Sequence, residues 1–325
     1  MKKHFKKLLL MALMAVMAVG LIACGTDKSD NESTKEEKTS VTITSLDSSK
    51  NEIELEVPYN PKRIAILDLA SLDIIDELGV GDRVVGMAST SIDYLEKYSN
   101  DASIKNLGTI KEADLEAVME CEPDIIFIGG RLSKSYDALS EIAPVVYLAT
   151  DTNEGLVNSV SKNAKTIASI FGMEDKVDSL MSDFGARIDA IKKISSGKTA
   201  LVGMTTSGSF NLLGNDGRCS LIGVEAGFNN LTAAGSTSTH GNETSFETVV
   251  KQNPDYIFVM DRDSAISTAG AKNAKEIVEN ELVKTTDAYK NNHIIYLEHS
   301  NVWYTAEGGI QALDIMDKDH EKGLK

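Results

Sequence analysis

The fold is decided by two stretches of sequence, DLEAVMECEPDIIFIGGR at residues 114–131 and SFETVVKQNPDYIFVMDR at residues 245–262. They align without a gap at an offset of 131 residues, and seven of the eighteen positions are identical. In each copy, apolar residues at helical spacing lead to a Pro-Asp turn and then to a continuous apolar run, which is typical of a buried parallel strand. The repeat therefore predicts two similar α/β units.

An arginine ends each copy of the repeat, Arg131 in the first and Arg262 in the second. In open α/β sheets, ligands bind beyond the carboxyl ends of the strands. We therefore expect Arg131 and Arg262 to contribute to one ligand site, one from each unit.

Further apolar runs extend both units. Spaced apolar residues between Val177 and Ile191 predict a helix over about residues 174–194, which would span roughly 30 Å. The other expected elements are strands at 63–67, 83–87, 125–128 and 145–148 in the first unit and at 200–204, 256–260 and 294–297 in the second, a helix at 72–78 and a hairpin at 41–57.

The N-terminal sequence has the pattern of an export signal. Four lysines precede an apolar run at residues 8–21, which is short for a membrane span, and Leu-Ile-Ala-Cys ends it at Cys24. Residues 25–40 carry no apolar side chain suited to a core, so we expect a flexible tether there. Loss of residues 1–23 removes those four lysines and changes the net charge from −16 to −20, which argues against non-specific binding to nucleic acid or anionic lipid.

Three stretches in order carry a family resemblance: VPYNPKRIAILD at 57–68, LEAV and PDIIF within 115–127, and GNDGRCS at 214–220. Together they resemble the substrate-binding lipoproteins of iron–siderophore ABC importers. The resemblance implies an α/β fold of the class III periplasmic-binding-protein type. Its two Rossmann-like lobes would lie at 41–172 and 196–325, joined by one long rigid helix at 173–195, with the ligand cleft between them.

The same resemblance implies export and lipid anchoring. The signal peptide would occupy residues 1–23, and Cys24 would carry a diacylglyceryl group at the start of a tether over residues 24–40. The protein would then be held, as a monomer, on the outer face of the cytoplasmic membrane.

The resemblance is strongest to the branch that binds catecholate siderophores such as petrobactin, in which three arginines line the cleft. Arg131, Arg218 and Arg262 match them. Guanidinium groups suit an anionic ferric catecholate, because they donate several charge-assisted hydrogen bonds. The ferric iron would arrive within the siderophore, and no intrinsic cofactor is expected. Alternatively, each arginine pairs with a nearby carboxylate, for which Asp216, Asp261 and Asp263 are available.

Four further residues concern the ligand and its iron. His240 matches a histidine that completes iron coordination in this branch, although a lone loop histidine is usually solvated. The companion tyrosine of the branch falls on Asn301 or Val302, which favours a siderophore that already saturates the metal. Trp303 and Tyr304 are candidate ligand contacts, with packing in the core as the alternative.

Glu116 and Glu247 match the surface glutamates through which such receptors dock on the two permease subunits. They also occupy equivalent positions of the internal repeat. The alternative interpretation is that each is an ordinary solvated helix residue. Cys121 and Cys219 show no metal-ligand spacing, and we expect two buried, unreactive thiols.

The main rival hypotheses are other ligands and an enzyme. Haem or cobalamin would suit the same fold, but haem needs a Tyr, His or Met axial ligand, and three arginines argue against it. A siderophore esterase needs a nucleophile beside a base, for which only Ser220 with His240 is available. Phosphate-loop, nucleophile-elbow and zinc-helix motifs are missing from the sequence, so we expect a binding protein and not an enzyme.

Overall fold

The computed structural model describes residues 38–233 and 236–324, and Lys38–Lys325 form one compact unit. The expected signal peptide, the lipidated Cys24 and nearly all of the tether lie outside the described residues. Within the described ranges, no helix is both long enough and apolar enough to cross a membrane.

The first lobe is built on a parallel sheet of five strands in the order β5-β4-β3-β8-β9. Alternate residues of β3 enter different cores: Ile64 and Ile66 pack on one face, Ala65 and Leu67 on the other. Helices therefore cover both faces, as a parallel sheet requires. The strands are β3 (Ile64–Leu67), β4 (Val84–Met87), β5 (Lys105–Asn106), β8 (Ile125–Ile128) and β9 (Val145–Tyr147).

The second lobe contains the sheet β13-β11-β10-β14-β15, with β12 also paired to β10. The expected runs form β10 (Thr199–Thr206), β14 (Tyr256–Asp261) and β15 (Ile294–Tyr296), which pair in parallel. The sequence did not predict the antiparallel β11 (Ser209–Leu212), whose short polar-apolar mixture gives a weak strand signal.

The repeated residues have the same structural role in both lobes. Each copy forms a helix followed by a central strand, α3 (Leu115–Glu120) before β8 and α9 (Phe246–Gln252) before β14. The repeated aspartate then accepts a backbone N–H at the start of the neighbouring strand. Asp124 accepts from Arg63 at 2.9 Å, and Asp255 accepts from Thr199 at 2.8 Å. The Pro-Asp pair therefore fixes where two adjacent strands begin.

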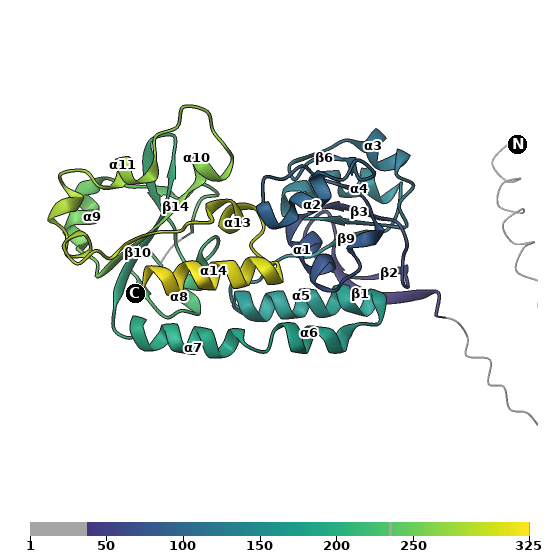
Figure 1. The fold of residues 1–325 in the computed structure, drawn as a ribbon, viewed down its shortest axis with the longest axis horizontal. Helices are drawn as coiled ribbons and strands as arrows, with labels where there is room; N and C mark the ends of the chain where they lie inside the picture. Colours follow the sequence, from purple (N-terminus) through teal and green to yellow (C-terminus); the bar gives the residue numbers. More distant parts are fainter. Residues whose placement is uncertain (1–37, 234–235, 325) are drawn as a thin grey trace, which may run out of the picture. The chain divides into compact units, whose positions relative to one another are not determined.

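Four helices pack along the two lobes (Figure 1). They are α5 (Leu156–Phe171), α6 (Glu174–Leu180), α7 (Phe184–Ser195) and α14 (Ile310–Gly323). The expected single helix at 173–195 is interrupted at residues 181–183, so α6 and α7 are separate. Ser182 explains the break, because its hydroxyl donates to the Ser179 carbonyl at 2.9 Å and competes with the helical backbone pattern.

The remaining elements complete both lobes. The hairpin expected at 41–57 forms from β1 and β2, and the helix expected at 72–78 is α1. The bounds are β1 (Ser40–Leu46), β2 (Glu52–Pro58), α1 (Leu69–Glu77), α2 (Glu96–Ser99), β6 (Gly108–Thr109), β7 (Glu112–Ala113), α4 (Tyr136–Ser140), α8 (Ser220–Val224), β12 (Asn229–Asn230), β13 (Asn242–Glu243), α10 (Arg262–Ala265), α11 (Ala274–Val278), α12 (Asp287–Lys290) and α13 (Ser300–Thr305).

Candidate ligand-binding site

Tyr304, on α13, brings the three predicted arginines together. The guanidinium carbons of Arg131, Arg218 and Arg262 lie 5.5, 4.5 and 5.7 Å from the centroid of its ring. These are cation–π distances. The structure therefore places the three arginines, which are far apart in sequence, around one side chain.

The end of each repeat strand positions one of these arginines. Arg131 follows β8, and its Nη2 donates to the backbone carbonyl of Tyr304 at 2.9 Å, a contact from the first lobe to the second. Arg262 directly follows β14, and its Nε donates to the Tyr304 hydroxyl at 3.2 Å. Both side chains lie beyond the carboxyl ends of their strands, where the repeat predicts a ligand site.

Arg218 comes from a loop that is tied to the loop of His240. Its Nη1 donates to the carbonyl of Thr239 at 2.9 Å. The carboxylate of Asp216 accepts the amide of Thr237 at 2.8 Å, and the hydroxyl of Thr237 accepts the amide of Gly214 at 2.9 Å. The two loops thus hold each other and direct Arg218 toward Tyr304.

Among the described residues, only one arginine of the cluster has a carboxylate partner. Arg262 pairs with Asp263 at 3.1 Å. Asp216 caps the loop described above, and Asp261 caps α10 instead of pairing with an arginine. In the described part of the chain, no carboxylate lies within ion-pair distance of Arg131 or Arg218. Two of the three positive charges therefore remain available to an anionic ligand.

The arginines also change the acidity of Tyr304. Burial by itself raises the pKa of the phenol, but the hydrogen bond from Arg262 and the charges of Arg218, Arg262 and Lys111 outweigh it, and the net pKa is lowered. Lys111 is an exposed residue of the turn between β6 and β7 and also lowers the pKa of His240. It is a further cation of the site that the sequence did not reveal, because nothing places this turn opposite α13.

Trp303 does not contact the site, contrary to the expectation from the sequence. It is fully buried, and its indole N–H donates to Asp319 at 2.9 Å while its ring packs edge-to-face on His320. Successive helix residues point about 100° apart. Because α13 directs Trp303 into the core, it directs Tyr304 toward the arginines.

His240 is exposed beside the arginine cluster. Partial desolvation and the charges of Arg262, Arg218 and Lys111 lower its pKa, which favours the neutral imidazole. The position expected for a tyrosine is not in the cluster: the amide of Asn301 donates to the Ser91 carbonyl at 3.1 Å, and Val302 is buried. Among the residues that the structure describes, no three His, Cys, Asp or Glu side chains are grouped to hold a metal ion.

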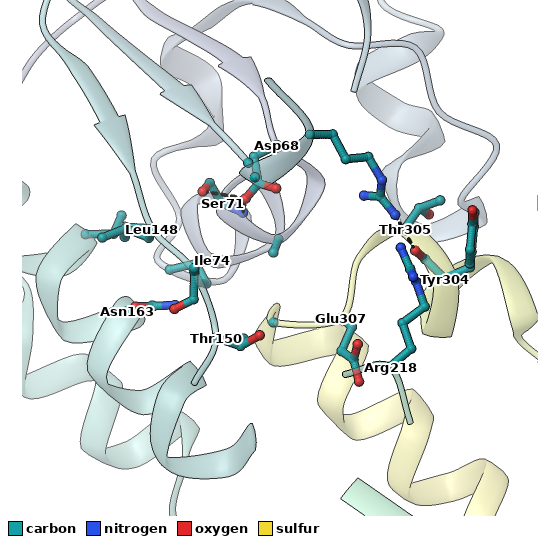
Figure 2. Close-up of a pocket in the computed structure, with 17 residues that line it drawn as sticks. Asp68, Ser71, Ile74, Leu148, Thr150, Asn163, Arg218, Tyr304, Thr305 and Glu307 are labelled. Atoms are coloured by element: carbon teal, nitrogen blue, oxygen red, sulfur yellow. Dashed lines mark hydrogen bonds between the residues drawn. The ribbon is translucent and has the colours of Figure 1, made fainter. Parts of the chain in front are cut away.

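A cavity of about 270 Å³ lies beside the cluster, between residues of both lobes (Figure 2). The first lobe contributes Asp68, at the start of α1, and Thr150, after β9, whereas the second contributes Tyr304 and Glu307. Burial raises the pKa of the Asp68 carboxyl, and it raises the pKa of Glu307 to about 7. Neither acid was predicted as a site residue: Asp68 ends the stretch at residues 57–68 without a recognisable role, and Glu307 stands in no motif.

The two predicted docking glutamates occupy equivalent exposed positions. Glu116 is in the first turn of α3, which Asp114 caps, and Glu247 is in the first turn of α9, which Ser245 caps. Cys121 and Cys219 are free and buried, and burial raises the pKa of both thiols. Ser220 is buried at the start of α8, whereas His240 is exposed, and no hydrogen bond joins them within residues 38–233 and 236–324.

Comparison with known proteins places this architecture in a family. The model of the periplasmic binding protein family matches residues 64–300. The chain belongs to this family. Because its members and the relatives described below are binding proteins, the chain is a binding protein and not an enzyme, and the Ser220–His240 esterase is discarded.

Three relatives are similar over nearly their whole length. The petrobactin-binding protein YclQ of Bacillus subtilis is 36% identical over 98% of this chain and 99% of its own, and its crystal structure gives a TM-score of 0.80. The catecholate-siderophore binding protein VctP of Vibrio cholerae has 31% identity and a TM-score of 0.78, covering 87% of this chain and 100% of its own. The iron-uptake ABC transporter substrate-binding protein PiuA of Streptococcus pneumoniae has 32% identity and a TM-score of 0.79, covering 88% and 99%.

Proposed function

We propose that this protein is an extracytoplasmic receptor for a ferric siderophore of the catecholate, petrobactin-like class and that it delivers this ligand to an ABC permease. The observation that carries the proposal is the convergence of three guanidinium groups on Tyr304, two of them without a carboxylate partner among the described residues. Unbalanced positive charge in a cleft favours an anion.

The chemistry of the cluster suits a ferric catecholate. Such a complex carries net negative charge and many oxygen acceptors around the metal, and each guanidinium group presents several N–H donors in a fixed plane. The buried ring of Tyr304 adds an aromatic surface between these donors. The names of two relatives, a petrobactin-binding and a catecholate-siderophore binding protein, support the same ligand class. Neutral His240, at the edge of the cluster, would complete the iron coordination only for a siderophore that leaves positions open.

Delivery would use the two faces that carry Glu116 and Glu247. Their equivalent places in the repeat suit a permease made of two similar subunits, each offering basic residues. A lipid on Cys24 and the tether that follows would keep a monomeric receptor near that permease. The two lobes of the receptor would comprise residues 41–172 and 196–325.

The test is a calorimetric titration of residues 25–325 with four ligands: ferric petrobactin, a ferric hydroxamate, haemin and cobalamin. We expect saturable 1:1 binding of ferric petrobactin, at least about 100-fold tighter than that of the other three, a difference of about 3 kcal/mol. Preference for haemin or cobalamin would establish the alternative ligand on the same fold. Preference for the hydroxamate would contradict the catecholate class while keeping the siderophore receptor.

A further inference from the structure

Glu307 is a carboxylate inside the cleft that has no part in the proposed ligand contacts. It lies on the loop between α13 and α14, beside Arg218 (Figure 2). Two neighbouring cavities, of about 270 and 360 Å³, share Thr150, Arg218 and Glu307 as lining residues. Glu307 is therefore the acid that faces both spaces where a ligand would enter.

The backbone that carries Arg218 also holds this carboxylate. Glu307 Oε1 accepts the amide N–H of Cys219 at 3.2 Å. Cys219 has a φ of +61°, a conformation that is uncommon for a residue with a side chain and costs energy unless its surroundings hold it. Glu307 thus supports the loop that carries Arg218 and also faces the guanidinium group of Arg218.

The surroundings of Glu307 shift its pKa in opposite directions. Burial raises its pKa most and Glu225 also raises it, whereas Arg218, the Cys219 amide and Arg131 lower it, so that the net pKa is about 7. In residues 38–233 and 236–324, no lysine or arginine nitrogen lies within 4.0 Å of its carboxylate. Besides the two arginines, the other titratable groups of the described residues that face the two cavities are Asp68, Asp151, Asp216 and Tyr304.

We propose that Glu307 is the internal counter-charge of Arg131 and Arg218 in the empty cleft and takes up one proton from solvent when an anionic ferric complex enters. This inference rests on the proposed function. The entering negative charge disfavours a nearby ionised carboxylate, and the positive charge of the two guanidinium groups is then balanced by the ligand in place of Glu307. The carboxylate and one proton give a carboxylic acid, and no electrons are transferred.

Proton uptake makes capture depend on pH in a defined direction. With a pKa of about 7, Glu307 is ionised in about three quarters of the molecules at pH 7.5. Binding of one ligand should therefore be accompanied by uptake of roughly 0.7 proton by the protein. The contribution of Glu307 to affinity should fall by about tenfold between pH 6 and pH 8. The variant Glu307→Gln carries no titrating group and should lose this part of the dependence while still binding.

The test is calorimetry with ferric petrobactin at pH 7.5 in phosphate and in Tris, two buffers that differ in ionisation enthalpy. Wild-type protein and the exposed control Glu141→Gln should both take up roughly 0.7 proton per ligand. Glu307→Gln should take up at least about 0.5 proton fewer and bind at least as tightly. Equal proton uptake in all three proteins would overturn the proposal.

Melting temperatures of the ligand-free proteins separate this inference from the ligand assignment. A carboxyl whose pKa is raised in the folded state stabilises the protein at low pH, and this stability is lost as the pH rises through the folded pKa. From pH 6 to pH 8, the wild-type melting temperature should therefore fall more than that of Glu307→Gln. Equal falls would overturn the role of Glu307 whether or not ferric petrobactin binds. Unequal falls without any binding of ferric petrobactin would instead overturn the proposed receptor function, and the coupling with it.

Discussion

Asp73 of the first lobe and Glu225 of the second each cap the N-terminus of a helix from the other lobe. Asp73, on α1, accepts the amides of Gln311 and Ala312 at the start of α14, both at 2.9 Å. Glu225, which follows α8, accepts the amides of Leu156 and Val157 at the start of α5, both at 2.8 Å. Each lobe thus supplies the anion that caps a long helix beside the other lobe.

The first residue of each capped helix follows a glycine that provides no capping side chain of its own. A Cβ at Gly309 would lie 2.3 Å from an Asp73 oxygen, and one at Gly155 would lie 3.0 Å from a Glu225 oxygen. Glycine therefore makes room for the carboxylate from the opposite lobe. These two caps, with α5 and α14, fix the lobes to each other and restrict wide opening.

Removal of either cap should weaken both stability and the connection between the lobes. Asp73→Ala and Glu225→Ala should each lower the free energy of unfolding in urea by about 1–3 kcal/mol, because two helix amides lose their acceptor. X-ray scattering should show a larger radius of gyration for both ligand-free variants. The control Asp114→Ala removes a cap within one lobe and should cost about 1 kcal/mol without expansion. Unchanged scattering for both variants would contradict the tethering role.

The three arginines should differ in what their removal costs. Arg131→Ala and Arg218→Ala should each weaken binding of ferric petrobactin by about 10- to 100-fold, since each removes charge-assisted hydrogen bonds. Arg262→Ala should also lower stability by about 1–3 kcal/mol, because it leaves the buried Asp263 unpaired. Calorimetry and urea unfolding measure the two effects. The exposed control Lys134→Ala, from the turn that follows Arg131, should change neither.

His320 should make the fold sensitive to acid. It is fully buried between Phe258 and Trp303, and among the described residues neither ring nitrogen has a hydrogen-bond partner. Burial lowers its pKa to about 4, so the unfolded chain binds the proton first, and stability is lost as the pH falls from about 6.5 toward 4.

The variant His320→Leu isolates this effect. Its loss of unfolding free energy between pH 7.5 and pH 5 should be smaller than that of wild type by about 2 kcal/mol. Urea unfolding at the two pH values measures the difference, and comparison with wild type cancels the opposing contributions of acids with raised pKa, such as Asp73. An identical loss in both proteins would show that His320 does not titrate in this range.

The surface glutamates should affect transport and not binding. The double variant Glu116→Ala with Glu247→Ala should keep its affinity for ferric petrobactin, since both residues lie outside the cleft. Uptake of ferric petrobactin through the receptor and its permease should fall at least about tenfold. Glu141→Ala, another exposed glutamate, should behave as wild type. Normal uptake by the double variant would contradict the docking role.

The repeat made the central part of both lobes predictable. Its helical spacing, Pro-Asp turn and continuous apolar strand act locally, so α3–β8 and α9–β14 follow from the sequence, and the position of Arg131 and Arg262 follows from sheet topology. The adjacent Trp303 and Tyr304 could not be assigned in advance. Which of two neighbours faces the core depends on the rotation of α13, and tertiary packing sets that rotation.

The residues missed by the sequence analysis act across long distances in the chain. Glu307 and Asp73 are single acids outside any motif, and their roles depend on Cys219 and on the start of α14. The C-terminal helix α14 was equally hard to predict, because its charged residues form no clear pattern, and Asp317 and His320 are buried in it. Local sequence carries no signal for such contacts.

The most direct test of the central claim is one calorimetric comparison. Ferric petrobactin is titrated into the wild-type protein and into the triple variant Arg131→Ala, Arg218→Ala, Arg262→Ala, with folding of both checked by circular dichroism. We expect saturable 1:1 binding by wild type and a loss of affinity of at least about 1000-fold, or about 4 kcal/mol, in the triple variant. Equal affinity in a folded triple variant would contradict the assignment of the arginine cluster as the ligand site.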